Sequence, residues 1–249
     1  MSKTKNEVGL VKKQEVGLMT PGAPQRGFEV SFNQNDYVIP RAKLIQALSP
    51  EMNEGLEGVK IGSIINSLTK EILPMEFIPV FAFKNFTRFN PRSKDDPNFD
   101  PNFEPGAMIW TSVDPYDPRV LKQTKFGPNG EKPAATTFLN FFSYFPGSPM
   151  PIIISFSKSS YKSGKQLLSL AKFSRGDMFS KKYELTSAVE SNSIGTYSVL
   201  KVAALGDSSP EEFAICEKLW KDFAGSVQDI RMDSEEEVAD ESVQGKRPY

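Results

Sequence analysis

The sequence contains no histidine and a single cysteine, Cys216, among its 249 residues. Zinc fingers, zinc-dependent deaminases and other Cys/His metal clusters need several such ligands, so these classes are excluded. Catalytic triads that use histidine as the base are excluded for the same reason. One cysteine cannot form a disulfide within the chain, which favours a reducing, cytoplasmic setting.

Long apolar stretches are also missing from the sequence. No run approaches the roughly 18 residues that indicate a transmembrane helix. The first residues of the chain lack the apolar region of a secretory signal peptide. We therefore expect no membrane partner. The apolar fraction of 39% is slightly low for a compact protein, so we expect part of the chain to lie outside the packed core.

Charge is distributed unevenly along the chain. Residues 211–249 contain 11 acidic and 5 basic residues, whereas residues 1–210 contain 20 acidic and 25 basic residues. The stretch 229–241 alone holds seven acids and one arginine, which is typical of a disordered, solvated tail. The pattern is therefore a basic body followed by an acidic tail. Aromatic residues are also plentiful, with 19 Phe, 7 Tyr and 2 Trp.

The stretch Met150–Leu205 carries the clearest pattern of secondary structure. Residues 151–156 form an apolar, β-branched run that predicts a strand. An amphipathic pattern over Ser163–Phe173 predicts a helix. Two further strands are expected at Lys182–Glu190 and Thr196–Ala203, joined by a turn that contains Asn and Gly. Strand, helix and hairpin in this order match the second half of a five-stranded OB barrel.

The rest of the chain is interpreted around that proposal. The predicted fold is mainly β with flanking helices: a five-stranded OB-fold barrel with an N-terminal extension and a disordered acidic C-terminal tail. Pro79 predicts a bulge or an edge position in the first strand. Upstream strands are expected at residues 75–89, 107–113 and 136–145, and a capped helix after Pro210. The predicted boundaries are a mobile arm over 1–36, the OB-fold domain over 37–228 and the tail over 229–249.

Two kinds of segment faintly suggest ligand chemistry. The fragments 58–63 and 161–165 combine Gly, Lys and Ser, but neither completes a phosphate-binding P-loop. The repeated Asp-Pro-Asn-Phe of residues 96–103 offers carboxylates whose spacing is not that of an EF-hand, so we interpret it as solvated turns. We find no catalytic constellation, and we expect a protein that is not an enzyme and needs neither cofactor nor metal.

Basic residues interleaved with aromatic ones form the strongest functional pattern. Single-stranded nucleic acid needs cations that follow its phosphates and flat rings on which its bases stack. Each aromatic residue in a strand can equally be a core residue, and each lysine a solvated one; these alternatives stay open. The candidate binding residues are Lys84, Phe86, Arg88, Phe89, Trp110, Tyr144, Lys158, Tyr161, Lys162, Lys165, Lys181 and Lys182.

The layout resembles that of phage-encoded single-stranded DNA-binding proteins, which are OB folds with acidic C-terminal tails. The resemblance rests on the order of five expected strands, one helix and the tail: Phe77–Phe83, Ala107–Val113, Ile152–Phe156, the helix, Tyr183–Glu190, Thr196–Ala203 and Asp229–Glu241. It implies sequence-independent coating of single-stranded DNA during phage replication, recombination or repair, in the host cytoplasm. It also implies that the tail contacts replication or recombination proteins.

A protein of the virion or of its assembly, with a self-associating β-domain, is the alternative function. The proline-rich loops and the N-terminal arm favour it, whereas the acidic tail and the clustered bases do not. The sequence leaves open the oligomeric state, including a homo-oligomer, and the choice between DNA and RNA.

Overall fold

The computed structural model describes residues 38–192 and 195–225. The expected N-terminal arm (1–36) and acidic tail (229–249) lie outside the described residues, as do two residues of the turn in the C-terminal hairpin. Within the described ranges, no helix combines the length and the apolar character needed to cross a membrane.

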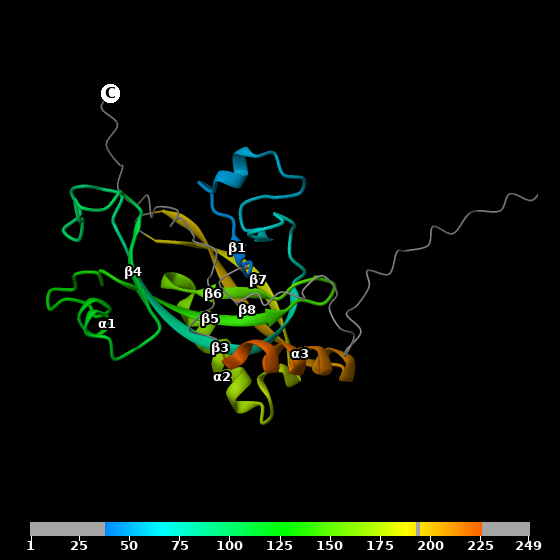
Figure 1. Ribbon diagram of the computed structural model, residues 1–249. Coiled ribbons are helices and arrows are strands. Elements are labelled where there is room, and N and C mark those ends of the chain that lie inside the picture. The colour runs from blue at the N-terminus through cyan, green and yellow to red at the C-terminus, as the bar shows by residue number, and fades with distance from the viewer. Residues whose placement is uncertain (1–37, 193–194, 226–249) are drawn as a thin grey trace, which may run out of the picture. The chain divides into compact units, whose positions relative to one another are not determined.

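The described residues form a mainly β structure with one large antiparallel sheet (Figure 1). The strand order is β6-β5-β3-β7-β8, and β4 pairs with β3 beside this path. The bounds of these strands are β3 (Glu76–Phe89), β4 (Met108–Ser112), β5 (Thr136–Tyr144), β6 (Ile152–Phe156), β7 (Lys181–Ser191) and β8 (Thr196–Asp207).

Helices and shorter elements surround the sheet. The α-helices are α1 (Pro118–Gln123), α2 (Tyr161–Phe173) and α3 (Pro210–Phe223), and the 3-10 turns are η2 (Pro50–Asn53), η3 (Lys158–Ser160) and η4 (Met178–Ser180). A separate two-stranded sheet joins β1 (Ala42–Leu44) to β2 (Ile64–Asn66). Ser209 caps α3 in a reciprocal capping box with Glu212, as the sequence predicts. Helix α1 and the β1–β2 sheet were not expected.

Strand β3 is the axis of the large sheet. Its 14 residues extend over roughly 45 Å, at about 3.3 Å per residue. One edge pairs with β5 along nearly the whole strand, with a bulge between Pro79 and Phe81 that confirms the expected irregularity. The other edge pairs with β7 at its first residues and with β4 at its last.

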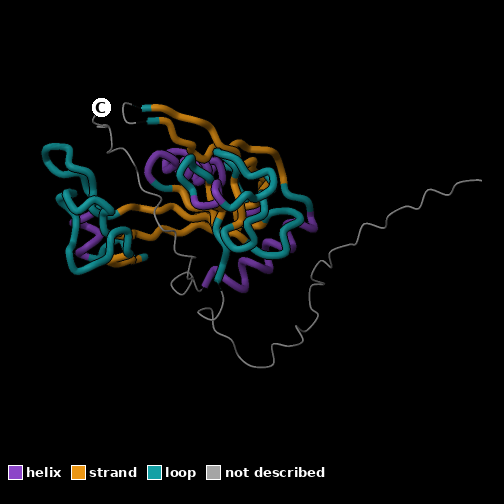
Figure 2. The backbone as a smooth tube through the Cα atoms, turned by 90° about the horizontal axis from the view of Figure 1, so that it is seen from above, coloured by secondary structure: helices purple, strands orange, loops and turns teal. Residues whose placement is uncertain are grey.

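The segment 107–113 therefore has a different role from the one expected. The sequence predicts this segment as the second strand of the barrel. In the structure, β5 is the strand that pairs with β3 over residues 78–87. Strand β4 instead pairs only with Phe86–Phe89. Residues 90–135, which include β4 and α1, form a lobe that projects beyond the sheet at the end of two paired strands (Figure 2).

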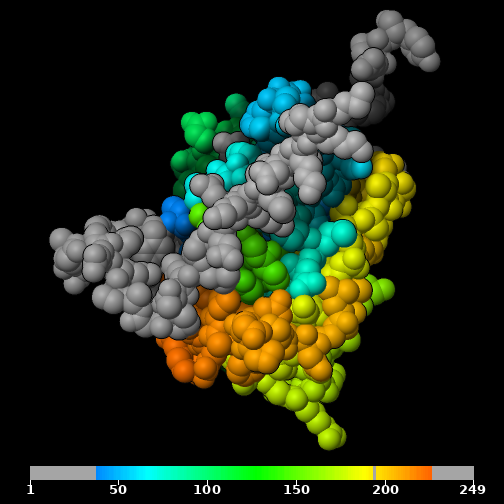
Figure 3. Space-filling model, turned by 90° about the vertical axis from the view of Figure 1, so that its right-hand side faces the viewer, coloured from blue at the N-terminus to red at the C-terminus, as the bar shows by residue number. Residues whose placement is uncertain are grey.

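Two apolar clusters pack against the sheet, one on each face. The first is enclosed by β3, β5, β6, β7, β8 and α2 and centres on Phe77, Phe141 and Tyr183. The second places Ile78, Phe142 and neighbouring residues under α3. The space-filling view in Figure 3 shows the orange surface of α3. Burial of these side chains on both faces makes the sheet the centre of the fold.

The large sheet is open, because β6 and β8 do not pair with each other. Side chains occupy the free edge of β8 instead. The amide of Gln46 bonds both backbone groups of Ser198, and the Ser160 hydroxyl accepts a hydrogen bond from the Leu200 N–H. The closed five-stranded OB barrel is thus not observed; the structure is a mainly β fold with a six-stranded open sheet and a two-stranded sheet.

Candidate nucleic-acid interface

The sequence-predicted binding residues fall into three groups along β3. The first lies at the start of the strand, the second near its middle on the side of α2, and the third at its far end in the lobe. Lys182 is paired with Glu76 at the first residue of β3, roughly 25 Å along the strand from Lys84. The twelve residues therefore do not form one patch.

The group at the start of β3 is occupied by internal interactions. Lys182 Nζ lies 2.8 Å from the Glu76 carboxylate and 3.5 Å from that of Glu212, and Lys181 pairs with Asp207. The contact with Glu76 raises the pKa of Lys182, and Glu212 raises it further. These two lysines are neutralised within the described part of the chain, so we remove them from the interface.

Tyr144 also leaves the candidate set. Its ring packs against the apolar cluster under α3 and is half-buried. Burial raises the pKa of its hydroxyl, and the nearby Cys216 and Glu212 raise it further. A ring in this position is part of the packing between the sheet and α3.

The central group lies on the face of the sheet that α2 covers. Lys84 is exposed and pairs across the strands with Leu139, which pairs with Phe156 in turn. Direct cross-strand partners project to the same face, and Leu139 belongs to the cluster that α2 contacts. Lys84 makes no salt bridge within the described ranges. It is thus a cation open to solvent beside α2.

The start of α2 supplies the other members of the central group. Lys162 and Lys165 are exposed, and the Lys165 ammonium lies 5.8 Å from the centre of the half-buried Tyr161 ring. A Cβ on Gly164 would lie 2.7 Å from that of Phe156, so glycine here allows α2 to pack closely on β6. The fragment 161–165 that faintly resembles a phosphate loop therefore has a packing role.

Lys158 lies between β6 and α2 in a conformation that is unusual for lysine. Its φ of 45° is in the left-handed region, which costs about 1 kcal/mol or more in a residue with a side chain. The side chain is exposed in η3. It lies two residues after Phe156, the last residue of β6, which pairs with Leu139 of β5. Such strained positions concentrate at functional sites.

The third group lies where β3 enters the lobe. Alternation places Arg88 on the same face as Lys84, and Arg88 pairs directly with Trp110 of β4. Arg119 of α1 lies over the Trp110 ring, 5.2 Å from its centre, and the indole N–H donates to Gln123. One guanidinium, that of Arg119, therefore covers the half-buried indole, whereas the Arg88 guanidinium donates a hydrogen bond to the Asn98 carbonyl at 3.1 Å.

The two phenylalanines predicted beside these residues differ in exposure. Phe86 is 6% exposed and belongs to the interior, so the proposed interface leaves it out. Phe89 is half-buried and remains a candidate. Alternation alone could not separate the two roles, because the strands that pair with β3 at Phe86 come from residues 112 and 137, which are distant in the sequence.

Four functional candidates in the lobe were missed from the sequence. Tyr116 and Phe126 are 80% and 72% exposed, and Lys122 and Lys125 are exposed beside them. The segment Lys-Gln-Thr-Lys-Phe of residues 122–126 has the same mixture of bases and rings as the predicted patches. That local signal is present in the sequence, but these residues are not among the predicted binding residues.

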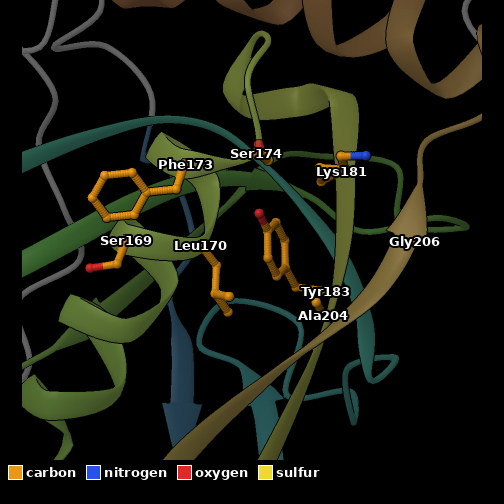
Figure 4. A pocket seen from close by; sticks show the side chains of 8 residues that line it. All are labelled: Ser169, Leu170, Phe173, Ser174, Lys181, Tyr183, Ala204 and Gly206. Atoms are coloured by element: carbon orange, nitrogen blue, oxygen red, sulfur yellow. The ribbon is translucent and has the colours of Figure 1, made fainter.

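A shallow pocket of about 470 Å³ lies at the other end of the sheet, between α2 and the ends of β7 and β8 (Figure 4). Its wall is mostly apolar, and Lys181 on its rim is paired with Asp207. The lining residues are Ser169, Leu170, Phe173, Ser174, Lys181, Tyr183, Ala204 and Gly206. Within residues 38–192 and 195–225, no group of three or more His, Cys, Asp or Glu side chains is placed to hold a metal ion.

Comparison with family models matches residues 11–228 to a family described as Pam3 phage gp34-like protein. Comparison with curated proteins finds no match. Comparison with solved structures finds none either. The family match covers most of the sequence, including both sheets and the lobe.

Proposed function

Since the chain belongs to the Pam3 phage gp34-like family, we propose that it is a phage protein that binds single-stranded DNA without sequence preference. Its role would lie in DNA replication, recombination or repair. The interface consists of the central group and the lobe group: Lys84, Arg88, Phe89, Trp110, Lys158, Tyr161, Lys162 and Lys165.

The observation that carries this proposal is the contrast between the lysines at the start of β7 and those beside the start of α2. Lys181 and Lys182, at the start of β3, are neutralised by carboxylates. Lys84, Lys162 and Lys165 are exposed and make no salt bridge in the described part of the chain. These three cations are therefore available to phosphates beside the start of α2, where a polyanion would gain from binding.

The pairing of the strands supports an OB-type fold for this proposal. In an OB barrel, the first strand pairs with the second and the fourth, the second with the third, and the fourth with the fifth. Strands β3, β5, β6, β7 and β8 have these pairings in this order, and α2 lies between the third and the fourth. OB folds are partly open barrels that bind oligonucleotides.

Binding of this kind needs no bond-making chemistry. Lysine ammonium groups displace the counterions of the phosphates, and exposed rings stack on bases at about 1–3 kcal/mol each. The hydrogen bond from Trp110 to Gln123 and the cation above the ring hold the indole in a fixed orientation. We propose that a base contacts this cluster while the strand continues past Lys84 toward α2.

Fluorescence anisotropy with labelled oligo(dT) tests the proposal. We expect binding that weakens steeply as the salt concentration rises, and a much weaker affinity for duplex DNA of the same length. Single-stranded RNA in the same series measures the preference between the two nucleic acids. Absence of oligo(dT) binding at low salt would refute the function, and large assemblies in sedimentation without nucleic acid would favour a virion or assembly role.

A further inference from the structure

The α1 region of the lobe exposes large apolar side chains close in sequence to exposed lysines. Tyr116, Leu121 and Phe126 are 80%, 48% and 72% exposed. Lys122 and Lys125 lie between them in the sequence and are also exposed. These five residues, here named the α1 strip, lie on α1 or within three residues of its ends. Neighbouring apolar residues exposed in this way usually mark a contact surface.

The opposite side of α1 is firmly attached to the lobe. Val120 is 3% exposed, and its carbonyl accepts a hydrogen bond from the Thr124 hydroxyl at 2.7 Å. The Gln123 side chain accepts from the Trp110 indole, and its backbone carbonyl accepts from the Ala135 N–H at 2.9 Å. These contacts hold α1 in place on the lobe, and the residues of the α1 strip are exposed to solvent.

The charges around α1 favour an anionic ligand. Asp117, which caps the start of α1, is already bound by the Arg119 guanidinium at 2.7 Å. Lys122 and Lys125 make no salt bridge with any residue in the described ranges. Two free ammonium groups therefore lie beside two exposed rings, and no free carboxylate of α1 opposes them.

We infer that the α1 strip binds single-stranded DNA, with bases stacked on Tyr116 and Phe126 and phosphates contacting Lys122 and Lys125. The inference rests on the proposed function and adds a second contact surface to it. Helix α1 has six residues and is about 9 Å long, so Tyr116 and Phe126, which lie just outside its two ends, are near enough for bases of one strand to reach both. Stacking on rings tolerates any base, which suits binding without sequence preference.

Ring variants and charge variants distinguish the two parts of this contact. We expect Tyr116→Leu with Phe126→Leu to lower the affinity for oligo(dT) at least tenfold and leave its salt dependence unchanged, because the rings are uncharged. We expect Lys122→Gln with Lys125→Gln to reduce the slope of log affinity against log salt by about 1.4, since each phosphate contact on a single strand contributes about 0.7. Phe173→Leu is the control, because this ring is 81% exposed on α2, outside the lobe.

The result also separates this inference from the proposed function. If both lobe variants bind oligo(dT) with the same affinity and salt slope as the wild type, the inference is overturned and the proposed function stands. A wild-type protein that fails to bind would overturn both. Thermal melting of each variant checks folding, and the leucine substitutions keep the apolar bulk at these exposed positions.

A spectroscopic readout locates the contact independently of affinity. The chain has two tryptophans, Trp110 in the lobe and Trp220 on α3. In a Trp220→Phe background, Trp110 is the sole indole, and its ring lies under Arg119 of α1. We expect oligo(dT) to quench its emission in proportion to binding, and we expect the double leucine variant to lose part of that quenching. An unchanged Trp110 spectrum at saturating oligo(dT) would contradict contact with the lobe.

Discussion

The side-chain amide of Gln46 bonds both backbone groups of Ser198, a residue 152 positions away in the chain. The Ser198 N–H donates to Gln46 Oε1 at 2.9 Å, and Gln46 Nε2 donates to the Ser198 carbonyl at 2.9 Å. The amide therefore occupies the place of a neighbouring strand along the free edge of β8. Just before Gln46, Arg41 bridges to Ile153 of β6, so one short segment spans the gap between β6 and β8.

We expect Gln46→Ala to destabilise the fold by about 2–3 kcal/mol. Ser198 is 5% exposed, so the substitution leaves a buried donor and a buried acceptor without partners. Urea unfolding followed by circular dichroism measures the change. Gln166→Ala is a matched control, because Gln166 is exposed and makes one long bond of 3.5 Å to the Val202 carbonyl. Equal losses in the two variants would show that Gln46 does not support the open edge.

Lys158→Gly separates a binding role from a structural one. Glycine adopts positive φ without strain, so we expect unchanged or slightly higher stability together with weaker binding of oligo(dT). Arg175→Gly is the control, because Arg175 also has a positive φ of 55° and an exposed cationic side chain, but lies beyond the other end of α2. A comparable loss of affinity in both variants would argue against a specific contact at Lys158.

The buried carboxylate of Glu51 predicts a loss of stability in acid. Burial raises its pKa, but hydrogen bonds from Lys43 and Lys70, at 2.8 and 2.9 Å, lower it by more, to about 2. Because the pKa is lower in the folded state than in the unfolded state, the stabilisation is complete above about pH 4.5 and declines as the pH falls toward 2.

Glu51→Gln tests this origin. We expect the variant to be less stable than the wild type at neutral pH, by an amount on the order of 2–3 kcal/mol. The difference between the two proteins should shrink between pH 4.5 and 2, because the wild-type carboxylate becomes protonated there. Unfolding curves across this range provide the comparison, and a constant difference would contradict the assignment.

Cys216 is expected to be inert in the folded protein. It is 0% exposed in the cluster under α3, and burial, with a contribution from Glu212, raises the pKa of its thiol to about 12. The thiolate is the reactive form, so a disulfide reagent should label Cys216 only as fast as the protein opens. Labelling with and without urea measures this rate, and stoichiometric reaction of the native protein within mixing time would disprove the burial.

Patterns within short windows were sufficient to locate most elements. The β-branched run ending at Phe156, the amphipathic pattern ending at Phe173 and the proline at position 210 each give a local signal, and the strand and the two helices lie there. Helix α1 was missed because its six residues are too few for an amphipathic period to repeat. Its start was nevertheless available from the Asp-Pro pair at residues 117–118, which caps it.

The sequence by itself therefore determined the strands of the large sheet, the long helices and the mixture of bases and rings, because these depend on spacing along the chain. Only the tertiary structure decided which of those groups are free. Lys182 is neutralised by Glu76 and Phe86 is buried, whereas Lys84 is open to solvent. Whether a cation is neutralised or a ring is covered depends on partners that folding brings from distant positions, and no local pattern contains that information.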